Sequence, residues 1–212
     1  MFQTLLDFVF PRRSLTGEEG EFVTEEEFQK LHSFPVVEEK HVLLGRGIEW
    51  LDAIRAGSSY HYCPLLKKAI HTFKYQRIPG LAEHLASLIT AAPLPQVPEG
   101  AVLCPVPLHW SRLNERGFNQ SELLARELSG HMGIPMRCLL SRTRATGFQS
   151  HRSRAERLVA MQDAFVCRQR SAPPFVVLID DLATTGATLD ACARALKERG
   201  VTHVEAWVVA HG

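Results

Sequence analysis

The sequence predicts an α/β protein with a central, mostly parallel sheet flanked by helices and a small N-terminal appendage. From residue 101 onward, short apolar runs alternate with helical patterns. Residues 175–179 are an unbroken apolar run, which is typical of a strand buried on both faces. Residues 189–199 place apolar side chains on one helical face, and a further apolar run follows at 201–209. Strands separated by helices indicate parallel pairing.

Length and composition fit one main domain. The 212 residues allow a domain over 46–212 and an N-terminal arm over 1–45. Hydrophobic content of 45% and charged content of 22% are ordinary for a globular protein. The formal net charge is only +1, so any site for an anion must be built locally.

Cysteine usage and hydropathy predict a cytoplasmic protein. The five cysteines are widely spaced and include no C-x-x-C pair, so we expect no disulfide framework. The apolar stretch Met1–Phe10 is short, and its basic residues follow it, in the opposite order to a secretory signal. No window approaches the ~20 apolar residues of a membrane span.

The N-terminal half of the chain is mainly helical in its pattern. An acidic run over 18–27 overlaps a short helix, which Pro35 ends. A connector rich in proline follows the last of the helices, at 91–100. The helices are expected at residues 24–32, 50–55, 65–73 and 81–89.

The C-terminal half supplies the strands of the predicted sheet. The helix at 189–199 has Lys197 and Arg199 in its last turn and Gly200 placed to cap it. The strands are expected at residues 101–106, 175–179 and 201–209, and the helices at 121–128 and 189–199.

The segment Val176–Leu189 carries the most specific signal, because it joins a buried strand, an acidic pair, a loop of small residues and a helix start. Ligands of parallel sheets bind beyond the carboxyl ends of strands. Small residues let the backbone approach a ligand, threonine hydroxyls suit phosphate oxygens, and helix N-termini favour anions. Carboxylates repel phosphate and suit sugar hydroxyls or magnesium. The acids are Asp180 and Asp181, and the loop is Ala183, Thr184, Thr185, Gly186, Ala187 and Thr188.

This pattern predicts a site for a phosphorylated sugar. The alternative is a simple turn with a helix cap, but a cap needs one short polar residue and this stretch offers five. A P-loop is excluded because no Gly-Lys-Ser/Thr follows the glycine.

Two further polar blocks precede this loop. Cys104-Pro105-Val106-Pro107-Leu108-His109 ends the strand at 101–106, and Arg116-Gly117-Phe118-Asn119-Gln120-Ser121 follows. These blocks form either a second binding loop with basic residues or a proline-stiffened turn before a helix cap. A basic cluster then contains Arg142, Arg144, Thr146 and Gln149, and continues with Arg152, Arg154 and Arg157. It is either a solvated surface, a flap over pyrophosphate, or a contact for nucleic acid.

The acidic pair and its loop resemble the phosphoribosyl-pyrophosphate motif of type I phosphoribosyltransferases. With the C-P-V-P-L-H, R-G-F-N-Q-S and R-x-R-x-T-x-x-Q blocks in order, and with Phe73-Lys74-Tyr75, the chain resembles the ComF/GntX family over roughly residues 60–212. The resemblance implies a type I phosphoribosyltransferase-like fold.

The resemblance also implies a role for each block. Asp180 and Asp181 meet the ribose hydroxyls and hold magnesium, and residues 183–188 bind the 5-phosphate. Pro107, Leu108, His109 and Arg116 line the pyrophosphate side, and His109 is a candidate proton donor to the leaving group. Arg142, Arg144, Thr146 and Gln149 form the candidate flap.

The N-terminus departs from the family pattern. ComF relatives usually open with a four-cysteine zinc ribbon, whereas no cysteine precedes Cys63 here. Ser14, Thr24 and Glu27 stand about where thiolates are expected. A structural zinc site needs four ligands, usually Cys or His, so we expect a degenerate ribbon without zinc.

Three functions remain open at this point. The resemblance implies transfer of a phosphoribosyl group from phosphoribosyl pyrophosphate to an unknown acceptor. The alternatives are a non-catalytic competence protein that acts in DNA uptake and binds single-stranded DNA, and a nucleotide-sensing regulator. Assembly as a homodimer is also left open.

Overall fold

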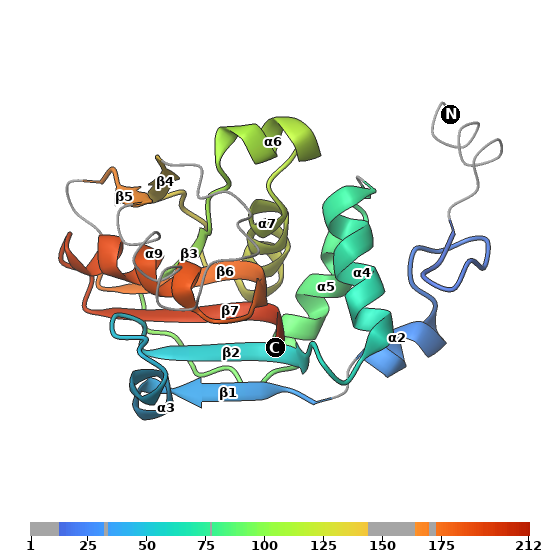
Figure 1. Cartoon of the computed structure of the whole chain (residues 1–212), viewed down its shortest axis with the longest axis horizontal. Helices are drawn as coiled ribbons and strands as arrows, with labels where there is room; N and C mark the ends of the chain where they lie inside the picture. The colour runs from blue at the N-terminus through green and yellow to red at the C-terminus, as the bar shows by residue number, and fades with distance from the viewer. Residues whose placement is uncertain (1–12, 32–33, 77, 144–163, 170–172) are drawn as a thin grey trace.

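A five-stranded sheet forms the centre of the molecule. The computed structural model describes residues 13–31, 34–76, 78–143, 164–169 and 173–212. The strands lie in the order β1-β2-β7-β6-β3 (Figure 1). β1 is antiparallel to β2, and the other neighbours are parallel. The α/β class is confirmed, and the arrangement is consistent with the fold of type I phosphoribosyltransferases. The strands are β1 (Val36–Glu39), β2 (Ala53–Ser59), β3 (Val102–Pro105), β6 (Phe175–Ala183) and β7 (His203–His211).

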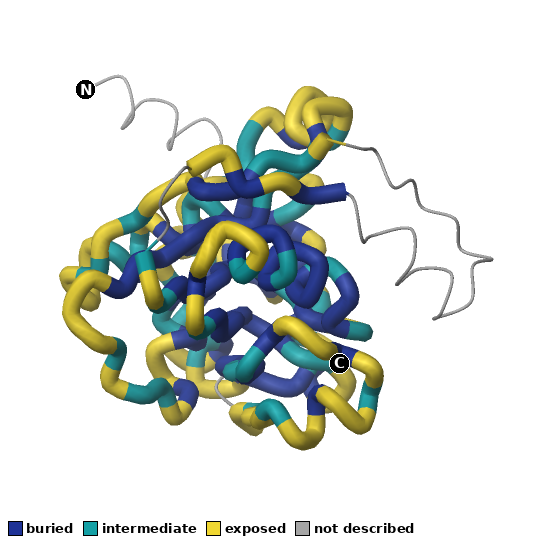
Figure 2. Tube along the Cα trace, turned by 90° about the vertical axis from the view of Figure 1, so that its left-hand side faces the viewer, coloured by how far each residue is buried: buried dark blue, intermediate teal, exposed yellow. Residues whose placement is uncertain are grey.

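Helices cover both faces of this sheet, and each face has its own core. Val176 and Leu178 of β6 pack on the side of α9 (Ala187–Lys197). Val177 and Ile179 pack on the other side, because successive side chains of a strand point to opposite faces. The buried segments lie inside the molecule with exposed segments around them (Figure 2). The second face is covered by α4 (Pro64–Tyr75), α5 (Leu81–Thr90) and α7 (Gln120–Met132).

Five shorter elements complete the described residues. β4 and β5 pair with each other as a separate antiparallel ribbon. Every helix in the described part of the chain is too short or too polar to cross a bilayer. The shorter elements are α2 (Glu25–Leu31), α3 (Lys40–Gly45), α6 (Trp110–Arg116), β4 (Leu140–Arg142) and β5 (Phe165–Cys167).

One predicted element is wrong. Residues 50–55 were expected to be helical, but β2 begins at Ala53 and lies between β1 and β7. Backbone pairing on both sides therefore overrides the local apolar spacing. Gly57 shows how closely α5 covers this strand, since a Cβ there would lie 2.2 Å from the carbonyl oxygen of Leu88. The other predicted helices and strands occur, with small shifts at their ends.

Part of the predicted N-terminal arm lies in the main sheet. β1 and α3 fall within residues 1–45, and Val36 to Glu39 pair with β2. Leu43 of α3 is fully buried in the core on the α9 side. Residues 36–45 are therefore packed as part of the same core as the sheet.

The positions expected for zinc ligands form a hydrogen-bonded cluster around Glu27. The carboxylate of Glu27, which is 3% exposed, accepts from the Ser14 hydroxyl at 3.0 Å, the Thr24 N–H at 2.9 Å and the Thr16 N–H. In return, the Thr24 hydroxyl accepts from the N–H of Glu27 at 3.2 Å, so the pair caps α2. The Glu27 carboxylate thus links α2 to the segment that contains Ser14 and Thr16.

Candidate functional site

A pocket of about 140 Å3 lies at the carboxyl ends of β3 and β6. In parallel sheets this is the usual place for a ligand. The pocket brings together residues from distant parts of the sequence, on α4, α6, α7, β4 and β6. Its lining consists of Lys74, Val106, Pro107, Leu108, Arg112, Arg116, Gln120, Ser121, Arg142, Asp180, Asp181, Leu182 and Thr188.

The acidic pair lies near the carboxyl end of β6 and is bound by side chains of α4 and α7. Asp181 is 5% exposed, and its Oδ1 is 2.8 Å from Nζ of Lys74 on α4. Asp180 Oδ1 accepts from the Ser121 hydroxyl of α7 at 2.8 Å and from the N–H of Asp181 at 2.9 Å. Both carboxylates are therefore fixed at the floor of the pocket.

The charges of this group are strongly linked. Burial, and then the charge of Asp181, raise the pKa of Asp180 to about 6, although Lys74 and the Ser121 hydroxyl act in the opposite direction. Burial would lower the pKa of Lys74, but Asp181 outweighs it and the pKa is raised. Lys74 is thus charged at neutral pH, and Asp180 is an acid whose ionisation is costly.

The predicted phosphate loop forms a second hollow, of about 50 Å3, beside the first. Asp180, Leu182 and Thr188 line both hollows, so the two are adjacent. Gly186 has φ of +80° and caps the start of α9. A side chain there would be strained, and its Cβ would meet Ile48 at 3.3 Å. All six predicted loop residues, 183–188, line this hollow.

Cationic side chains also line the first pocket. Arg116 is 7% exposed, and its NH1 donates to Oε1 of Gln120 at 3.0 Å. Its Nε is buried, and the described residues give it no hydrogen-bond partner. A buried donor without a partner is costly, and an anion in the pocket would relieve this cost. Lys74, Arg112 and Arg142 line the same region.

The other predicted residues fall in three places. Pro107 and Leu108 line the pocket. His109 is 7% exposed and caps α6, where its Nδ1 accepts from the Ser111 N–H at 3.3 Å. The pocket lining does not include His109. Of the candidate flap, Arg142 lines the pocket, whereas Arg144, Thr146 and Gln149 lie outside the described residues.

Sequence reasoning did not assign Lys74, Arg112, Gln120 and Ser121 to the site. Gln120 and Ser121 belong to the R-G-F-N-Q-S block, and Lys74 to the Phe-Lys-Tyr segment. These motifs marked the residues, but only the packing of α4 and α7 against β6 shows that they meet the acidic pair.

The acidic pair fits a magnesium ion that arrives with a phosphorylated ligand. Magnesium in such sites is usually held by one or two carboxylates together with phosphate oxygens. No group of three or more His, Cys, Asp or Glu side chains that could hold a metal occurs in the described ranges. Lys74 already occupies one oxygen of Asp181. If magnesium binds here, the two carboxylates would supply only part of its coordination sphere, and oxygens of the ligand would have to complete it.

Comparison with known proteins identifies the family. No model of a known protein family matches the chain. Competence protein F of Haemophilus influenzae is 31% identical over 161 residues, which cover 71% of this chain and 69% of that protein. DNA utilization protein YhgH of Salmonella typhimurium is 32% identical over 155 residues, 69% of this chain and 67% of that protein. Competence protein ComFC of Bacillus subtilis is 34% identical over 145 residues, 68% of this chain and 58% of that protein. The chain therefore belongs to the ComF family.

Proposed function

We propose that this protein acts in the uptake or utilisation of DNA, and that its pocket binds phosphoribosyl pyrophosphate or a nucleotide with magnesium. The first part is supported by relatives that are named competence proteins or DNA utilization proteins. The second part is supported by the pocket itself.

The observation that carries the ligand proposal is the order of chemical groups along the two hollows. A carboxylate pair lies between a threonine-lined loop at a helix start and a basic region that contains Arg116, whose buried Nε has no hydrogen-bond partner among the described residues. Carboxylates accept hydrogen bonds from sugar hydroxyls, while helix starts and guanidinium groups bind phosphate. This order suits a ribose with phosphate groups at both ends.

Each part of that ligand then has a partner. The 5-phosphate lies in the loop 183–188, the ribose hydroxyls bind Asp180 and Asp181, and the pyrophosphate lies near Arg112 and Arg116. Magnesium, when bound, would neutralise pyrophosphate oxygens. Lys74 adds a positive charge beside Asp181, so it limits the repulsion between the acidic pair and an anionic ligand.

Calorimetric titration with phosphoribosyl pyrophosphate and magnesium tests the ligand proposal. We expect saturable binding to the wild type, and a loss of about tenfold or more in Asp181→Asn, because a hydrogen bond to a charged group contributes about 1.5–3 kcal/mol. Arg126→Met is the matched control, since Arg126 is exposed on α7 in an ion pair with Glu122. If the wild type does not bind this ligand, the proposal is wrong.

Transfer of the phosphoribosyl group is the second candidate, and the intact acidic pair favours it. In this reaction the bond from C1 to pyrophosphate breaks, the electron pair leaves with pyrophosphate, and an acceptor nitrogen bonds to C1 and loses a proton. The protein need only hold the leaving group, orient the ribose and exclude water. Release of pyrophosphate across a panel of nitrogen bases tests it, and binding without turnover on any base would favour a non-catalytic role.

Contact with DNA would have to lie outside this pocket. Deoxyribose has no 2′-hydroxyl, and inside a strand its 3′-oxygen carries a phosphate that Asp180 and Asp181 would repel. We therefore expect single-stranded DNA to bind even when the pocket is saturated with phosphoribosyl pyrophosphate, with an affinity that falls as salt rises. Absence of binding at low salt would remove direct contact with DNA from the proposal.

A further inference from the structure

We propose that the segment after α3, residues 46–51, is a brace that pre-orients the phosphate loop, with Arg46 as its positioning residue. This inference rests on the proposed binding of a phosphorylated ribose. It gives a binding role to a segment at the boundary of the predicted N-terminal arm, which none of the sequence motifs includes.

Arg46 connects the first strand of the sheet to the phosphate loop. Its NH1 pairs with both carboxylate oxygens of Glu38 on β1 and lies 3.2 Å from Nε2 of His211 at the end of β7. Its NH2 donates to the carbonyl oxygen of Thr184 at 3.1 Å. The guanidinium is therefore anchored on two strands while it holds one peptide group of the loop.

The orientation of that peptide group matters for anion binding. The described residues contain no cis peptide bond, and in a trans peptide the C=O and the following N–H point in opposite directions. With the carbonyl of Thr184 held on the Arg46 side, the N–H of Thr185 faces away from Arg46. Because Thr185 lines the loop hollow, we infer that this N–H is preset as a donor to the 5-phosphate.

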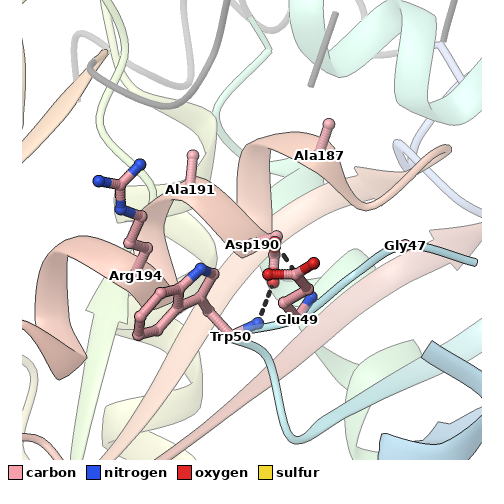
Figure 3. A pocket seen from close by; sticks show the side chains of 7 residues that line it. All are labelled: Gly47, Glu49, Trp50, Ala187, Asp190, Ala191 and Arg194. Atoms are coloured by element: carbon pink, nitrogen blue, oxygen red, sulfur yellow. Dashed lines mark hydrogen bonds between the residues drawn. The ribbon is translucent and has the colours of Figure 1, made fainter. Parts of the chain in front are cut away.

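Two further contacts fix the segment against the start of α9. The carboxylate of Asp190, 8% exposed, accepts from the backbone N–H groups of Trp50 at 2.7 Å and Glu49 at 3.3 Å (Figure 3). It also accepts from the N–H of Leu51 at 3.0 Å. Ile48 packs where a side chain on Gly186 would lie, at 3.3 Å from that Cβ position. The segment therefore contacts both the phosphate loop and α9, the helix whose N-terminus lines the loop hollow.

The brace should act on only one half of the ligand site. The loop hollow depends on the segment through Thr184, Gly186 and Asp190. The basic half is built instead from α4, α6, α7 and β4. A binding site that is already ordered loses less entropy when its ligand binds. Loss of the brace should therefore weaken binding of a sugar phosphate and leave binding of pyrophosphate nearly unchanged.

Titration of two separate probes, ribose 5-phosphate and pyrophosphate with magnesium, tests this inference in the full chain. For Arg46→Met we expect an affinity for ribose 5-phosphate that is lower by about tenfold, roughly the effect of one hydrogen bond to a charged group. The affinity for pyrophosphate should change by less than about twofold. Arg116→Met should show the reverse selectivity, and Arg126→Met, an exposed ion-pair residue, should change neither affinity.

A second variant keeps the test usable if Arg46→Met does not fold. Glu38→Gln keeps the side-chain volume but removes the charge that anchors Arg46, so it should give the same selectivity with a smaller loss. An equal loss for both probes, or no loss for ribose 5-phosphate, would overturn the brace. If the wild type binds neither probe, the proposed function fails instead, so the two failures are distinguishable.

Discussion

Near neutral pH, Asp180 is ionised, and its ionised form opposes folding. Its pKa is raised to about 6 in the folded protein by burial and by Asp181, against about 3.9 for an unperturbed aspartate. A group whose pKa is raised by folding favours the folded state below its unfolded pKa, and this contribution is lost as pH rises through the folded pKa. The ionised acid is therefore retained at a cost in stability, which a binding role would explain.

Asp180→Asn should stabilise the ligand-free protein, because an amide removes the charge and keeps the oxygen that accepts from Ser121. One pKa unit corresponds to about 1.36 kcal/mol, and Asp180 is only partly buried, so the gain over wild type should reach about 1–3 kcal/mol. The gain should be absent below about pH 3, well under the unfolded pKa, and nearly complete at about pH 7. Urea denaturation at a series of pH values measures it.

Asp52 gives a control of opposite sign. Although burial acts against it, hydrogen bonds from Lys197 and from the N–H of Val204 lower the pKa of Asp52. Its carboxylate therefore stabilises the fold above the unfolded pKa, and Asp52→Asn should be destabilising at pH 7 and less so near pH 3. If Asp180→Asn also destabilises the protein at pH 7, ionised Asp180 does not carry the cost in stability that its raised pKa implies.

At the scale of elements, Glu27 connects its own helix, α2, to the segment that precedes it. It caps α2 and also binds Ser14 and Thr16 in the preceding segment. Burial would raise the pKa of Glu27, but hydrogen bonds from Thr24, Thr16 and Ser14 lower it. This stabilisation is therefore present above the unfolded pKa and lost as pH falls through the lower folded value.

Glu27→Ala should lower the free energy of unfolding by about 1–3 kcal/mol, since it leaves donors in the cluster unsatisfied. The difference from wild type should shrink as pH falls below about 4.5. Glu26→Ala is the control, because the neighbouring Glu26 is exposed and pairs only with Lys30 in the described structure. Equal effects of the two substitutions would show that the cluster contributes nothing beyond the helix.

The elements also show what local sequence can and cannot predict. The strand and helix around the phosphate loop were predictable because residues 175–179 and 189–199 have clear local patterns. β2 was not, because its partners β1 and β7 are distant in the chain and pairing decided its conformation. Lys74 was missed as a site residue for the same reason. The Phe-Lys-Tyr motif marked Lys74, but its ion pair with Asp181 joins α4 to β6, and no local pattern predicts that contact.

At the scale of the molecule, the site and the N-terminal region share one core. Arg46, Asp190 and Ile48 connect the segment after α3 to the phosphate loop. The acidic pair, by contrast, is fixed by α4 and α7 on the opposite face of the sheet. The ligand site is thus supported from both faces of the sheet. A substitution in the helices of either face can therefore alter the geometry of the site.

Leu43 and Leu44 test whether residues 36–45 are part of this core or a separate arm. Leu43 is fully buried against the sheet, whereas its neighbour Leu44 is 51% exposed. Leu43→Ala should lower the free energy of unfolding by about 2–5 kcal/mol, because it opens a cavity in a packed core. Leu44→Ala should change it by no more than about 0.5 kcal/mol. Chemical denaturation of both variants, followed through one cooperative transition, gives the comparison.

A separate transition for the N-terminal region, or matching small effects at both positions, would place the domain boundary after α3. A large effect at Leu43 alone, in the single transition, would mean that β1 and α3 fold with the phosphate loop they help to support.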